Sequence, residues 1–169
     1  MRALVAYESY FGCTKAIAEA IADGLRLSLT PRVVPINDGH HHLGNYDLLL
    51  LGARTHERSM SRPSAPESVA ERAARSRSLR EWLDEMGMWT GHPAAAFGTR
   101  LPGPQAMTSR ISSGIASELR RHGFLLVTDP LSCLVNHNHE LLPAETQRAS
   151  VWAASLAAAL NRAVRISAH

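Results

Sequence analysis

The chain has 169 residues, of which 45% are hydrophobic and 20% are charged. These proportions are those of an ordinary globular protein, so they exclude global disorder and a long coiled coil, and the length fits a single domain spanning residues 1–169. The net charge is +3, but Lys15 is the only lysine among eighteen basic residues and the arginines are scattered, so we expect no nucleic-acid binding.

The sequence also argues against a membrane protein, a secreted protein and a metal-binding protein. No apolar run approaches the roughly 18 residues that cross a bilayer, and the first residues are too soon polar for a signal peptide, so we expect a cytoplasmic protein without a membrane segment. The two cysteines, Cys13 and Cys133, have no C-x-x-C spacing. The nine histidines include clusters at 40–42 and 137–139, which we interpret as solvated loops, and we expect no metal site.

Apolar runs and helical periodicity alternate along the first half of the chain. Thr14, Ile17, Ala18, Ile21, Ala22 and Leu25 recur at helical spacing, which predicts an amphipathic helix that ends near Gly24. Pro35 favours an edge position for the second strand, and Gly52 is expected to end the third. The predicted strands are residues 3–7, 32–36 and 46–51, and residues 37–45 are predicted to form a loop.

The second half continues the same alternation. Trp82 and Cys133 are predicted to lie in the core, whereas Trp89 fits either an exposed contact or a cover for the sheet edge. The last helix is expected to bury Trp152, Leu156, Ala159, Leu160 and Ala163. The predicted segments are a helix around 79–83, a strand at 94–97, a loop at 98–104, a helix at 106–122, a strand at 124–127 that 131–135 extends, and a helix at 143–162.

Five strands alternating with helices predict an α/β protein with a doubly wound five-stranded parallel sheet and helices on both faces. Ligands of such sheets bind beyond the carboxyl ends of the strands, at the point where the strand order reverses. The loops of interest are therefore residues 8–14, 52–62 and 98–105.

The first of these loops joins a buried strand to the start of a helix. A helix N-terminus offers unpaired N–H groups and a partial positive charge, which suit a phosphate group. Ser9 and Thr14 add hydroxyl groups, and Gly12 leaves room for a close approach of the backbone. The same residues also fit an ordinary turn and helix cap. Neither a Walker-type lysine motif nor the dinucleotide fingerprint G-x-G-x-x-G is present.

The segment V-A-Y-E-S-Y-F-G-C-T-K-A-I-A resembles the FMN-phosphate signature of the flavodoxin family, in which an aromatic residue precedes Ser/Thr-x-x-Gly-x-Thr and a helix. Residues 47–56, which end in Thr55-His56, look like the third strand and second flavin loop of that family, and residues 60–64 look like a variant of the same loop. Residues 97–104 occupy the place of the third flavin loop. The resemblance thus covers most of the chain.

The resemblance implies one tightly held FMN in a flavodoxin-like fold, whose redox chemistry belongs to the flavin. It places Thr55 and His56 beside the ring and the backbone of residues 98–101 at its pyrimidine edge, including Gly98, Thr99 and Arg100. The residues that it assigns to the phosphate are Ser9, Tyr10, Phe11, Gly12, Cys13 and Thr14.

The loops depart from the family pattern in their charge and aromatic content. Residues 54–62 and 98–104 contain no Trp, Tyr or Phe, and the third loop has no carboxylate. One positive charge 5 Å from the reduced ring is worth roughly 3 kcal/mol before screening at a dielectric of about 20, so we expect a less negative potential than in acidic flavodoxins. Arg54 stands where relatives carry a small residue or proline, and it is the residue that would obstruct the ring or bind a different anion if the site has lost FMN.

Three functions are open at this point. The first is an FMN-binding electron carrier that acts between redox partner proteins, which the absence of a separate acid or base favours. The second is an FMN-dependent NAD(P)H:quinone-type reductase, for which the aromatic-poor loops leave room above the ring. The third is an interaction domain with the same fold that has lost FMN.

Overall fold

The computed structural model describes residues 1–9, 12–38, 42–53, 78–103 and 110–167. Within these ranges the helices are α1 (Cys13–Leu25), the 3-10 helix η1 (Leu43–Asn45), α3 (Leu79–Met86), α5 (Arg110–Arg121) and α6 (Glu145–Ser167). The strands are β1 (Arg2–Tyr7), β2 (Thr30–Pro35), β3 (Leu48–Ala53), β4 (Pro93–Arg100), β5 (Leu125–Leu126) and β6 (Leu131–Leu134).

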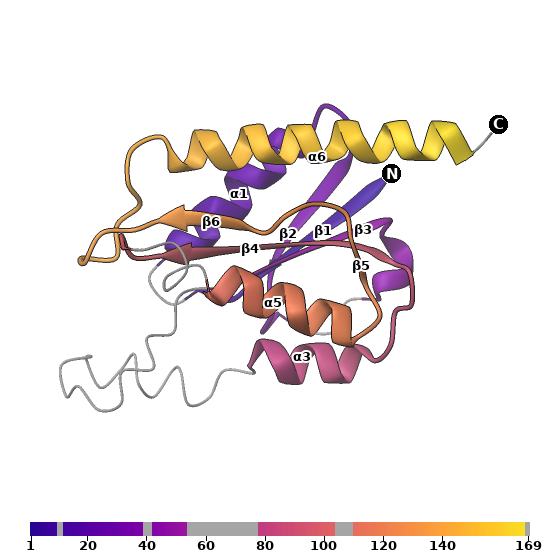
Figure 1. Cartoon of the computed structure of the whole chain (residues 1–169), viewed down its shortest axis with the longest axis horizontal. Helices are drawn as coiled ribbons and strands as arrows, with labels where there is room; N and C mark the ends of the chain where they lie inside the picture. Colours follow the sequence, from indigo (N-terminus) through magenta and orange to yellow (C-terminus); the bar gives the residue numbers. More distant parts are fainter. Residues whose placement is uncertain (10–11, 39–41, 54–77, 104–109, 168–169) are drawn as a thin grey trace.

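The strands form one parallel sheet in the order β2-β1-β3-β4-β5, with β6 also paired to β4. In Figure 1, α1 and α6 lie on one face of this sheet and α3 and α5 on the other, so the predicted doubly wound α/β class is confirmed. The predicted fifth strand and its extension form two separate short strands among the described residues, because β5 pairs with the start of β4 and β6 with its end. These two short segments share the fifth position of the sheet.

The central strands are those with continuous apolar sequence. Every residue of β3 is buried, as are residues 3–7 of β1, because helices cover both faces of the sheet. β2 lies at the edge, as Pro35 indicated, and only Val34 within it is fully buried. The third strand continues through Gly52 to Ala53, and a Cβ atom at Gly52 would lie 2.1 Å from the ring of Phe97. Gly52 is therefore required by the packing of Phe97 and does not end the strand.

The first helical layer packs α1 against α6. All six residues predicted to form the apolar face of α1 are buried. The prediction for α6 is partly wrong, because Ala159 is exposed, Trp152 is half-buried, and Ala149 and Ala153 are buried instead. Cys133 lies in this core as predicted, and burial raises its pKa to about 12, which keeps it protonated.

The second helical layer begins with a capped helix. Ser78 accepts a hydrogen bond from the Glu81 amide at 3.2 Å, and the Glu81 carboxylate accepts one from the Ser78 amide at 2.8 Å. This capping box satisfies two N–H groups that the first turn of α3 leaves without intrahelical partners. Trp82 and Leu83 are buried against the sheet, so the prediction for Trp82 is confirmed.

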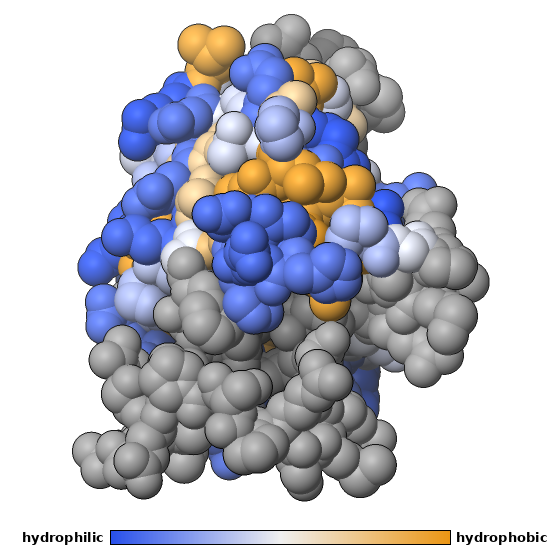
Figure 2. All heavy atoms as spheres, turned by 90° about the vertical axis from the view of Figure 1, so that its left-hand side faces the viewer, coloured by the Kyte–Doolittle hydropathy of each residue, from blue (hydrophilic) through white to orange (hydrophobic). Residues whose placement is uncertain are grey.

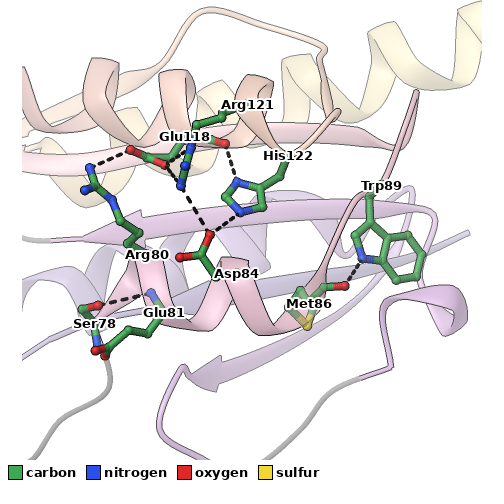
Figure 3. Close-up of polar contacts among 9 residues, drawn as sticks. All are labelled: Ser78, Arg80, Glu81, Asp84, Met86, Trp89, Glu118, Arg121 and His122. Carbon is green, nitrogen blue, oxygen red and sulfur yellow. Dashed lines mark hydrogen bonds and ion pairs between the residues drawn. The ribbon is translucent and has the colours of Figure 1, made fainter.

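Polar side chains join α3 to α5 at the surface of this layer (Figure 3). Arg80 contacts Glu118 at 2.8 Å, and Arg121 contacts Glu118 at 2.9 Å and Asp84 at 3.3 Å. The buried ring of His122 lies between the Glu118 carbonyl and the Asp84 carboxylate, at 2.9 and 3.0 Å. The arginines are largely exposed, so these ion pairs fix the relative position of the two helices more than they add stability.

Three aromatic rings contact one another edge to face near His92, which directly precedes β4. His92 lies 5.5 Å from Trp89 and 5.9 Å from Phe124, measured between ring centroids. Trp89 is half-buried, packs against the hydrophobic core and donates its indole N–H to the Met86 carbonyl at 2.8 Å. The His92 Nε2 atom is buried and has no hydrogen-bond partner among the described residues.

The environment of His92 predicts a loss of stability at acidic pH. Burial lowers the pKa of His92 below its ordinary value of 6.5, although Asp47 opposes the shift. Because the unfolded chain binds the proton more tightly, stability from neutral His92 is present above about pH 6.5 and is lost as the pH falls toward the folded pKa. We expect His92→Phe, which keeps the ring contacts, to reduce this loss in urea unfolding measured above and below pH 6.5. Identical pH profiles for the two proteins would contradict the assignment.

Among the residues placed in the structure, no helix is both long enough and apolar enough to cross a bilayer.

Candidate functional site

The carboxyl ends of the central strands lie in register at one edge of the sheet. Tyr7 pairs with Gly52, and Gly52 pairs with Phe97. The Glu8 amide donates to the Gly52 carbonyl at 2.9 Å, so the chain leaves β1 alongside the end of β3. Strand order reverses between β1 and β3, which makes this edge the expected ligand site of a doubly wound sheet.

The N-terminus of α1 has no side-chain cap among the described residues. Gly12 occupies the N-cap position with φ +89°, a left-handed conformation that favours glycine, and a Cβ atom there would meet nothing within 4 Å. The Ser9 hydroxyl oxygen accepts the Gly12 amide at 3.1 Å, and no side chain caps the helix itself. The first N–H groups of α1 have no intrahelical acceptors. The first turn of α1 itself carries no acidic residue that would interact with its positive end.

Thr14 holds a buried hydroxyl group in this first turn. The residue is 1% exposed, and its Oγ1 atom has no hydrogen-bond partner within the described ranges. An unpaired buried hydroxyl costs about 1–3 kcal/mol, so such groups in folded proteins call for an explanation. A ligand that forms a hydrogen bond at the start of α1 would explain the unpaired Thr14 hydroxyl.

Cys13, the first residue of α1, contacts a loop that is distant in sequence. Its thiol donates to the carbonyl of His139 at 2.6 Å. Burial raises the pKa of the Cys13 thiol, Glu140 adds to that shift, and a hydrogen bond with the Leu141 backbone acts in the opposite direction. The group is therefore a thiol at neutral pH and acts as a hydrogen-bond donor.

The loop between β6 and α6 is internally braced. The Asn136 side-chain oxygen accepts the amides of Asn138 and Glu140, each at 2.9 Å, and its NH₂ group donates to the Glu140 carboxylate at 2.8 Å. Val135 and Leu141 form an antiparallel bridge across the base of the loop. This loop is not among the candidate functional loops predicted from the sequence. No local sequence pattern indicates that its backbone reaches Cys13.

The comparisons with solved structures agree with this arrangement. A flavodoxin from the domain Archaea matches with a TM-score of 0.66 and 24% identity, over 93% of this chain and 96% of that one. The oxidised Flavodoxin 1 from Bacillus cereus matches with a TM-score of 0.65 and 20% identity, over 92% and 97%. This chain has the flavodoxin fold.

The flavodoxin fold also matches one part of a larger protein. The Flv1 flavodiiron core from Synechocystis sp. PCC6803 aligns with a TM-score of 0.65 and 15% identity, over 96% of this chain but 36% of that one. No protein-family model matches the sequence, and no curated protein is significantly similar to it. The similarity therefore shows the flavodoxin fold and leaves the function to be argued from the site.

The surface at the carboxyl ends of β4 and β6 carries both hydrophobic and hydrophilic residues. Figure 2 looks onto the edge at which β4 and β6 end, and shows a hydrophobic patch near the centre with hydrophilic residues in front of it and beside it. Apolar area next to a few polar groups is typical of small-molecule sites. No group of His, Cys, Asp or Glu in the described part of the chain is arranged to hold a metal ion.

The predicted third loop is partly wrong. Gly98, Thr99 and Arg100 belong to β4, and they pair with Ser132, Cys133 and Leu134 of β6. The strand continues past 97 because β6 provides a partner for it. The Arg100 carbonyl accepts the Val135 amide at 2.9 Å, and Thr99 is 4% exposed. The assignment of residues 98–100 to the ring of a flavin stays a prediction.

The structure brings part of the predicted site together. Ser9, Gly12, Cys13 and Thr14 gather where β1 meets α1. Tyr10, Phe11, Arg54, Thr55 and His56 lie outside the described residues, as does the rest of the second loop.

Proposed function

We propose that this protein binds FMN and acts as an electron-transfer protein. The observation that carries the proposal is the Thr14 hydroxyl, which is buried without a partner in the described structure at the start of α1. The flavodoxin fold supports the proposal because its ligands bind at the switch point between β1 and β3, where Thr14 lies.

The residues at the helix N-terminus fit a phosphate monoester. N–H groups of the first turn and the Thr14 hydroxyl supply donors, and hydrogen bonds to an anionic oxygen are about twice as strong as neutral ones. The Ser9 oxygen already accepts the Gly12 amide, so its own O–H is available to donate. Gly12 leaves open space where a side chain would stand. Tyr10, Phe11 and Cys13 complete the proposed phosphate loop.

The remaining assignments follow from the resemblance of the sequence. Thr55 and His56 are proposed to lie beside the flavin ring, and residues 98–100 near its pyrimidine edge. When bound, FMN supplies one- and two-electron redox chemistry, and the protein contributes orientation and electrostatics. We propose redox proteins as partners in the cytoplasm, with an acidic docking patch that complements the net charge of +3.

The proposal predicts that the purified full-length protein takes up FMN. After incubation with FMN and desalting, we expect the visible absorption bands of flavin at a stoichiometry of one per chain. Oxidation of NADH or NADPH by the loaded protein alone would favour the reductase over the carrier. A protein that stays colourless after this treatment contradicts FMN binding and supports an interaction domain.

A further inference from the structure

We infer that Cys13 is a positioning residue, whose thiol fastens the loop between β6 and α6 against the first turn of α1 and so shapes the phosphate site. The inference rests on the proposed FMN function and adds a structural determinant to it. Its central observation is the 2.6 Å hydrogen bond from the Cys13 thiol to the His139 carbonyl, which joins residues 126 positions apart.

The loop is braced internally, and its position relative to α1 depends on contacts outside it. His139 adopts φ +61°, a left-handed conformation that is uncommon for a residue other than glycine. The Asn136 side chain braces the loop from within, and the backbone N–H of Asn136 donates to the Glu140 carbonyl at 2.8 Å. These bonds fix the internal shape of the loop. The Cys13 thiol joins the loop to the first turn of α1, while Leu141 packs against the core cluster that includes Ile17 and Ala18 further along that helix.

A second observation links this contact to a ligand. Thr14 directly follows Cys13, and its buried hydroxyl has no partner in the ranges that the structure describes. Cys13 and Thr14 share the first turn of α1, so holding the Cys13 side chain also holds the N–H groups and the hydroxyl that face a phosphate. The loop contact and the ligand site thus meet in two consecutive residues.

The protonation state of Cys13 suits this role. Burial raises its pKa, so the group donates a hydrogen bond at neutral pH and is a weak nucleophile. A serine hydroxyl can donate in the same direction, whereas a methyl group cannot. Cys13→Ser and Cys13→Ala therefore separate the hydrogen bond from the volume of the side chain.

The test combines two measurements on the full-length protein. In the ligand-free state, amide hydrogen exchange in residues 136–141 is expected to accelerate about fivefold in Cys13→Ala, which corresponds to the loss of one ordinary hydrogen bond. In titrations, the same variant is expected to bind FMN about fivefold more weakly and to bind riboflavin, which lacks the phosphate, as the wild type does. Cys13→Ser is expected to restore most of both losses.

Asn138→Ala is the matched control in the same loop. Asn138 contributes its backbone amide, and not its side chain, to the bracing of the loop in the described structure, so this variant should leave FMN affinity and the Cys13 contact unchanged. Unchanged loop exchange in Cys13→Ala would overturn the inference. Equal weakening of FMN and riboflavin, or of neither, would overturn the phosphate-positioning role.

Failure of the proposed function has a different signature. If the wild-type protein binds neither FMN nor riboflavin, the FMN proposal falls and the phosphate role of Cys13 falls with it. The exchange measurement still reports on the loop contact in that case, because it uses the ligand-free protein.

Discussion

Gly24→Ala is expected to destabilise the protein by about 3 kcal/mol and to lower its melting temperature by roughly 10 °C. A Cβ atom at this position would lie 2.1 Å from the backbone oxygen of Ser150 and 2.9 Å from its carbonyl carbon. The clashing atoms belong to the backbone of Ser150, so no side-chain rotation can remove the clash. The helices α1 and α6 would have to move apart. The measurement is thermal and urea unfolding of the ligand-free protein.

Gly114→Ala provides the matched control for this prediction. Gly114 lies in α5, is exposed, and has nothing within 4 Å of the place where a Cβ atom would stand. Alanine is favoured over glycine in a helix interior by about 1 kcal/mol, so the same substitution should stabilise the protein here. If both variants change stability in the same direction, the close contact between α1 and α6 is not what requires Gly24.

The features that the sequence predicted well are those with a local physical signal. The apolar face of α1 was predicted residue by residue, because a helix repeats its buried positions at a fixed spacing. Pro35 indicated the edge position of β2, since proline lacks the N–H that a central strand requires. The apolar segment predicted as a strand at 46–51 forms β3, whose residues are all buried because helices cover both faces of the sheet.

The features that it missed depend on partners far away in the chain. Residues 98–100 extend β4 because β6 pairs with them, and β6 begins more than thirty residues later. Gly24 fitted a helix end by sequence, but the backbone of Ser150 is what requires glycine there. The contact of Cys13 with His139 spans 126 positions and involves a backbone carbonyl, which no side-chain pattern indicates.

Thr14→Val is expected to weaken FMN binding by well over tenfold while making the ligand-free protein more stable by about 1 kcal/mol. Valine has nearly the shape of threonine and removes only the hydroxyl. Because that hydroxyl is buried without a partner among the described residues, its removal relieves an unfavourable desolvation. The same removal deletes a charge-assisted hydrogen bond to the phosphate. FMN titration and urea unfolding of the ligand-free protein measure the two effects separately.

Thr14→Ser isolates the hydroxyl, because it is expected to change stability in the opposite direction and to leave FMN binding nearly intact. It keeps the donor but removes a buried methyl group, which should cost about 1 kcal/mol of stability and leave FMN affinity within a few-fold of the wild type. The opposite signs of the two variants distinguish a ligand-directed hydroxyl from one that serves the fold. If Thr14→Val instead destabilises the ligand-free protein and binds FMN normally, the hydroxyl has a partner within the chain. The phosphate of the cofactor then has to be held elsewhere.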